Sequence, residues 1–178
     1  MAQLKKTSTA NQPAQPQQRP IDKEFAAYSA SHQSPANNII HWICIPLFFL
    51  GLFGLLWSIP FPHIKILGKY NGFFNWASFL IALSIYYYYK LSPVLSYFIL
   101  FTLFGFSYVI IQLEQLQKAG GPMLWQISGA MLVLSLIGII VGNNMETTKP
   151  NIGKQLKSLA IAPIFLWHLI VNKLGVKF

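Results

Sequence analysis

Four long apolar runs dominate this sequence and restrict what it can fold into. They extend over about 39–59, 73–89, 93–112 and 123–142. Each is close to the roughly 20 residues that a helix needs to cross about 30 Å of hydrocarbon. They are too long and too continuously apolar for the strands of a membrane barrel. The sequence therefore predicts an all-α fold, a multi-pass transmembrane helical bundle of about four spans.

The composition agrees with a membrane protein and argues against a nucleic-acid-binding one. Hydrophobic residues make up 54% of the chain and charged residues only 10%, whereas a soluble domain carries about 25% charged residues. The net charge of +9 comes from residues at the chain ends and in loops. They form no basic stripe and accompany no base-stacking motif. We expect membrane lipids as partners and no nucleic acid; the oligomeric state stays open.

The polar stretches divide the chain. Residues 1–20 are rich in Gln, Ala and Pro and predict a disordered tail, followed by one membrane-embedded domain over 21–178. That domain begins with a short amphipathic helix at about 21–31. It ends with a segment at about 152–174 that mixes lysines with apolar residues and contains Pro163. We interpret the last segment as an interfacial or re-entrant helix pair.

The distribution of cations predicts the orientation. Ten Lys and Arg residues lie on the side of both termini and three on the other side, which places both termini in the cytoplasm. The twelve lysines against one arginine hint at an AT-rich bacterial genome. We therefore expect a bacterial inner membrane, with the endoplasmic reticulum as the alternative for a eukaryotic host.

This topology gathers distant polar residues at one membrane face. The residues predicted near the cytoplasmic face are His32, His41, Asn143, Glu146 and His168. His63 follows the first span and falls on the opposite face, so it is excluded from a site built by the others. Imidazoles are costly in lipid and are common metal ligands. The grouping therefore predicts a single site.

The first two histidines need a chain break to meet. His32 precedes His41 by nine residues, which on one continuous helix would place the two rings on opposite sides. Pro35 disfavours helix at Ser34 and provides the break that can fold His32 back. Asn37 lies four residues before His41 and projects from the same helix face.

Two imidazoles and one carboxylate form a familiar ligand set for Fe(II) that leaves positions open for O₂ and substrate. Glu146 could supply the carboxylate, and His168 could add a third imidazole. Ordinary interpretations remain open for each residue. The first two histidines would be hydrogen-bonding groups at the membrane interface, and Glu146 a solvated turn residue paired with Lys149. His168 would be an interfacial aromatic residue beside Trp167.

Two sequence blocks carry a resemblance to a known family. The first reads Tyr28-x₃-His32-x₄-Asn37-x₃-His41-Trp42-Ile43-Cys44-Ile45-Pro46, and the second comprises Gly142–Pro150, Ala162–His168 and Lys173–Gly175. The first block resembles the N-terminal signature of the 2-hydroxy-fatty-acid dioxygenase family, and the second, less specific block resembles its C-terminal part. The similarity covers the chain from about Phe25 to its end.

The resemblance implies an activity and a ligand set. Members of the family are thought to bind Fe(II) through histidines and to shorten 2-hydroxy fatty acids by one carbon with O₂, as in breakdown of the phytosphingosine chain. By their positions in the two blocks, the residues implied in metal binding and catalysis are His32, His41, Glu146 and His168, with Tyr28 and Asn37 as supporting residues.

One position departs from the family pattern. Asn143 stands where the family has a histidine, and an amide oxygen is a weaker iron ligand than imidazole. Two functions are therefore carried forward. The first is an Fe(II)-dependent dioxygenase that shortens 2-hydroxy fatty acids. The alternative is a non-catalytic lipid-binding or structural membrane protein derived from that family.

Overall fold

The computed structural model describes residues 19–147 and 151–175, and these residues form helices and no strand. The predicted all-α class is confirmed. The elements are α1 (Pro20–Ser31), α2 (Pro35–Ser58), the 3-10 helix η1 (Lys65–Phe73), α3 (Trp76–Leu91), α4 (Pro93–Lys118), α5 (Leu124–Asn144) and α6 (Ile152–Lys173). The predicted tail lies outside the described residues except at its last two positions.

Four of the described helices are long and apolar enough to cross a membrane, as expected of an integral membrane protein. They are α2, α4, α5 and, over Gly153–Lys173, α6. The apolar run at 73–89 instead forms α3, which has only 16 residues and is short for a span. Length and apolarity thus select four helices, of which α2, α4 and α5 fall in predicted spans; which helices cross the membrane stays a prediction.

The C-terminal segment is one continuous helix of 22 residues and not the helix pair expected from the sequence. Proline lacks the N–H that would bond to the carbonyl four residues earlier, so Pro163 was expected to break the segment. The helix nevertheless continues through it, as α2 continues through Pro46. Both prolines line the same cavity, described below.

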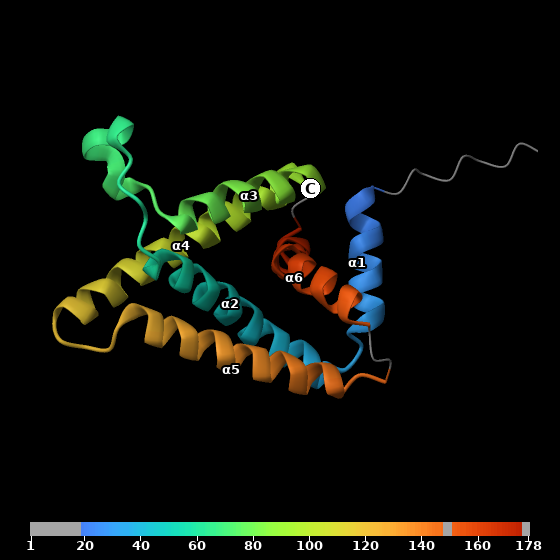
Figure 1. The fold of residues 1–178 in the computed structure, drawn as a ribbon. Helices are drawn as coiled ribbons and strands as arrows, with labels where there is room; N and C mark the ends of the chain where they lie inside the picture. Colours follow the sequence, from blue (N-terminus) through green and yellow to red (C-terminus); the bar gives the residue numbers. More distant parts are fainter. Residues whose placement is uncertain (1–18, 148–150, 176–178) are drawn as a thin grey trace, which may run out of the picture.

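Figure 1 shows how the helices are arranged. The α2–α5 pair and the α3–α4 pair lie close together near the connection from α4 to α5 and diverge toward their other ends. Helices α6 and α1 lie between the diverging ends, with α6 in contact with both α2 and α4. This arrangement brings the start of α2 and the end of α5 to the same corner of the molecule as the end of α1.

Small residues let α2 and α5 approach closely. A β-carbon built on Gly51 would lie 2.8 Å from the backbone nitrogen of Leu132 and the backbone oxygen of Ser128. A β-carbon on Gly142 would collide with the side-chain oxygen of Asn37. Such close contact of helix backbones is typical of membrane helices, where packing replaces the hydrophobic effect as the driving force. It fixes the position of His41 on α2 relative to the end of α5.

Candidate functional site

The rings of His32 and His41 lie together at the corner where α1 meets α2. Their centroids are 4.6 Å apart and the ring planes are inclined by 57°. Both side chains are buried. His32 directly follows α1, which ends at Ser31, and α2 begins at Pro35. The break between the two helices therefore folds His32 back onto His41. We refer to these two residues as the histidine pair.

Tyr28 contacts both members of the histidine pair. Its hydroxyl lies 2.8 Å from Nδ1 of His41, and its backbone carbonyl lies 2.9 Å from Nδ1 of His32. Its ring also stacks on the His32 ring, with centroids 4.2 Å apart and planes inclined by 11°. One turn of α1 thus orients both imidazoles through their Nδ1 atoms. Metal-binding histidines are commonly oriented in this way, through the nitrogen that does not bind the metal.

The hydrogen bonds restrict which nitrogen of each ring remains available. A carbonyl oxygen only accepts, so Nδ1 of His32 carries the proton and Nε2 carries the lone pair. Burial lowers the pKa of His32 below its ordinary 6.5, more than the Tyr28 carbonyl and the Glu146 charge raise it. The ring is therefore neutral near pH 7. Nε2 of His41 is buried and has no hydrogen-bond partner among the described residues.

A small cavity separates the histidine pair from α5 and α6. Its volume is about 20 Å³, and both histidines and Asn143 line it. A site for one water molecule needs roughly 10–15 Å³, so this cavity accommodates a single water-sized group or ion. The amide of Asn143 lies next to the His41 ring. The cavity therefore collects two imidazoles, the amides of Asn143 and Gln155, and the hydroxyl of Ser158. The sequence had grouped the two histidines with Asn143.

Glu146 contacts the start of α2. Its Oε1 accepts a hydrogen bond of 2.7 Å from the amide of Asn37, and its Oε2 accepts one of 3.0 Å from the backbone N–H of Gln33. The backbone N–H of Ser34 donates to the same carboxylate at 3.1 Å. Glu146 thus accepts from N–H groups at the start of α2, where helices leave such groups without an internal partner. Its predicted pairing with Lys149 lies outside the described residues.

The environment of Glu146 keeps it ionised. Burial acts to raise the pKa of its carboxyl, but the hydrogen bonds from Asn37, Gln33 and Ser34 outweigh burial and hold the pKa below its ordinary 4.5. Asn37 is completely buried and links this carboxylate to the same face of α2 that carries His41. Glu146 is therefore close to the histidine pair through Asn37, with both carboxylate oxygens already bound.

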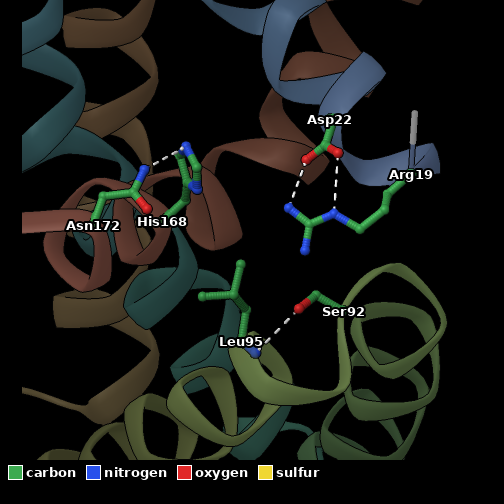
Figure 2. Close-up of polar contacts among 6 residues, drawn as sticks. All are labelled: Arg19, Asp22, Ser92, Leu95, His168 and Asn172. Atoms are coloured by element: carbon green, nitrogen blue, oxygen red, sulfur yellow. Dashed lines mark hydrogen bonds and ion pairs between the residues drawn. The ribbon is translucent and has the colours of Figure 1, made fainter. Parts of the chain in front are cut away.

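His168 lies on α6 against α1. Its ring packs on Phe25, with centroids 4.2 Å apart, and the amide of Asn172 donates to its Nε2 at 3.1 Å. Figure 2 shows this pair, with the ion pair of Arg19 and Asp22 at the start of α1 in the same view. Within the described residues, no group of three His, Cys, Asp or Glu side chains is placed to hold a metal ion. The structure therefore does not bring His168 into a ligand set with the histidine pair.

One larger cavity adjoins the histidine pair and a second adjoins the first, and neither was predicted from the sequence. One of about 310 Å³ is lined by Tyr28 and both histidines, and it also touches Trp42 and Leu166. A second, of about 200 Å³, lies among α2, α3, α4 and α6 and shares Trp42 and Leu166 with the first. These two residues come from different helices more than a hundred positions apart, so only the packing of α2 against α6 shows that they meet.

The comparison with protein families identifies the chain's relatives. The model of the Mpo1-like family, described as 2-hydroxy-palmitic acid dioxygenase Mpo1-like, matches residues 18–174. This range covers most of the 178 residues. The chain belongs to the Mpo1-like family. The assignment confirms the resemblance seen in the two sequence blocks and relates the chain to 2-hydroxy fatty acid dioxygenases. No curated protein and no solved structure gives a significant match.

Proposed function

We propose that this Mpo1-like protein is an Fe(II)-dependent dioxygenase that shortens 2-hydroxy fatty acids by one carbon. The observation that carries the proposal is the histidine pair, with its two rings 4.6 Å apart beside a cavity for one ion. With metal–nitrogen distances of about 2.1 Å, two imidazoles at right angles around one ion would have centroids roughly 4.5–5 Å apart. The spacing of the histidine pair fits that arrangement.

The available nitrogen and oxygen atoms suit iron, and they leave several coordination positions for O₂ and substrate. Nε2 of His32 and of His41 are the nitrogens left available, and Asn143 would offer an amide oxygen. In this proposal Glu146 and Asn37 hold the start of α2 in place and are not ligands, because the carboxylate oxygens are already hydrogen-bonded. His168 has no part in it. Bound Fe(II) would supply the means to activate O₂ and to chelate the substrate's carboxylate and hydroxyl.

The remaining protein groups would orient and enclose the substrate. Tyr28 fixes both imidazoles, and the cavity of about 310 Å³ beside them offers room for the carboxylate and hydroxyl end of the acid. One 2-hydroxy acid and one O₂ balance to the acid shorter by one carbon, CO₂ and water. No further oxidant or reductant is needed for that overall change.

The test combines metal content with product analysis. Purified protein supplied with Fe(II), O₂ and a 2-hydroxy fatty acid should release the acid one carbon shorter, detected by mass spectrometry. His32→Ala and His41→Ala should lose both iron and product. His63→Ala is the matched control, because His63 is exposed and lies in the loop after α2. Asn143→His should bind iron more tightly, since it adds a third imidazole beside His41.

The alternative function is a non-catalytic lipid-binding or structural membrane protein. The absence of a three-residue ligand group within the described chain and the amide at position 143 favour it. A preparation that holds lipid but takes up no iron, and converts no 2-hydroxy acid even when iron is supplied, would support this alternative and refute the enzyme.

A further inference from the structure

The cavity of about 200 Å³ among α2, α3, α4 and α6 is lined mostly by apolar residues, and it shares lining residues with the cavities beside the histidine pair. Its lining includes Ile45, which also lines the small cavity between the histidine pair and Asn143. Trp42 and Leu166 line both this apolar cavity and the larger one beside the histidine pair. These three residues thus connect the surroundings of the histidine pair to an apolar cavity between the helices.

Two of the hydroxyl groups that line the apolar cavity, those of Tyr88 and Thr102, form hydrogen bonds within the protein. Tyr88 donates to the backbone oxygen of Ala160 at 2.8 Å. Thr102 donates to the backbone oxygen of Phe98 and accepts a hydrogen bond of 2.9 Å from the indole of Trp167. Bound in this way, these groups have little need of a polar ligand, and the cavity favours a hydrocarbon.

The cavity runs away from the histidine pair along α2. Its residues on that helix extend from Trp42, next to His41, to Phe49. Eight residues of helix separate His41 from Phe49, a rise of about 12 Å. On α4 the lining ends at Phe106, whose ring packs against Phe53 of α2 with centroids 6.4 Å apart. Phe53 lies one turn beyond Phe49, so Phe106 lies at the end of the cavity that is farthest from the histidines.

We infer that this apolar cavity binds the alkyl chain of the 2-hydroxy fatty acid, with its carboxyl end at the histidine pair and its methyl end at Phe106. Phe106 then limits the chain length that the protein accepts. The inference rests on the proposed function for the identity of the ligand. It goes further because it assigns the alkyl chain a position and a direction, and it names the residue that determines chain-length specificity.

The first experiment measures chain-length preference. Phe106→Ala and the milder Phe106→Leu should shift the optimum of kcat/KM toward longer 2-hydroxy acids, on the order of tenfold for each methylene gained. Ile99→Phe should shift the optimum toward shorter acids, because Ile99 is a buried residue of the cavity wall. Phe104→Ala is the matched control, since Phe104 lies on the same helix but is 57% exposed.

The second experiment locates the chain without turnover. A variant with Trp57, Trp76 and Trp125 replaced by Phe keeps Trp42 and Trp167, which both line the cavity. A 2-hydroxy acid brominated near its methyl end should quench their fluorescence, and the unbrominated acid should compete. Trp42 is 40% exposed, so a brominated phospholipid should also quench it from the bilayer, and the unbrominated acid should not relieve that quenching. If the unbrominated acid also failed to relieve quenching by the brominated acid, the acid would be acting from the bilayer and the inference would be overturned.

The outcomes separate this inference from the proposed function. If the wild type shortens 2-hydroxy acids but the Phe106 variants keep the wild-type preference, the chain binds elsewhere and the dioxygenase stands. If no acid is shortened, the dioxygenase fails, and the quenching experiment alone decides whether the cavity holds the chain. Absence of quenching by the brominated acid would refute the cavity assignment in either case.

Discussion

The hydroxyl of Tyr28 lies 2.8 Å from Nδ1 of His41, while the backbone carbonyl of the same residue lies 2.9 Å from Nδ1 of His32. A single residue of α1 therefore orients two imidazoles, one on the following turn and one on the next helix. This relationship couples the placement of α1 to the geometry of the histidine pair, and it leads to the first prediction.

Replacing Tyr28 by Phe should reduce metal affinity about 10–100-fold, since it removes the hydrogen bond that orients His41. The stacking on His32 is retained, so the loss in unfolding free energy should be only about 0.5–1.5 kcal/mol. Iron content and thermal unfolding in detergent measure the two effects. Tyr86→Phe serves as the control, because Tyr86 is exposed on α3. An unchanged iron content in Tyr28→Phe would show that this hydroxyl has no part in metal binding.

Glu146→Gln should destabilise the protein by about 1–3 kcal/mol, because the partly buried backbone N–H groups of Gln33 and Ser34 and the buried amide of Asn37 lose a charged acceptor. Iron binding should fall less than it does in His32→Ala. Thermal unfolding and metal titration check the two parts.

Glu114→Gln is the comparison for that variant. Glu114 accepts a hydrogen bond of 3.1 Å from the Trp57 indole, and its replacement should cost less stability. If Glu146→Gln kept wild-type stability and lost all iron, Glu146 would be a metal ligand, as the sequence had suggested, and the positioning role would be refuted.

Gly51→Ala should destabilise the protein by about 1–3 kcal/mol, because its β-carbon would press against the backbone of α5. Gly105→Ala provides the contrast on α4: a β-carbon there has no neighbour within 4 Å. In the helix interior that second change should be neutral or stabilising by about 0.5–1 kcal/mol. Equal unfolding temperatures for the two variants would contradict the close packing of α2 on α5.

The metal-free protein should lose stability as the pH falls. Burial gives His32 a lowered pKa in the folded state. The unfolded chain therefore takes up a proton near its ordinary value of 6.5 while the folded protein does not. Glu146 also has a lowered folded pKa and adds a further loss below about pH 4.5. The unfolding temperature should drop between about pH 7 and pH 5, and His32→Gln should reduce that drop. A wild-type unfolding temperature that does not change over this range would contradict the burial of a neutral His32.

The sequence was sufficient to predict the helical class and the meeting of His32 with His41. Apolar run length determines the first, and the second follows from Pro35, which interrupts the helix between the two residues. Contacts between residues further apart in the sequence were harder to predict. Asn143 was grouped with His41, and both line the same small cavity. The contacts of Glu146 with the start of α2 depend on how the turn after α5 packs against the turn before α2.

The remaining differences have similar causes. Pro163 suggested a break, yet α6 passes through it, because tertiary packing holds a helix around a proline that the local sequence disfavours. His168 shares a membrane face with the histidine pair in the predicted topology. Its position against Phe25 depends on how α6 is turned about its own axis, which hydropathy does not specify. The cavities at Trp42 and Leu166 arise between helices and have no local sequence signal.

Glu146 belongs to the link that joins α5 to α6, and its partners Gln33 and Ser34 belong to the link that joins α1 to α2. One carboxylate thus connects, through hydrogen bonds, the segment before α6 to the segment after α1. Loss of this carboxylate would therefore weaken the attachment of both helices that cover the histidines, while the ion pair of Lys157 with Glu24 would still join α6 to α1.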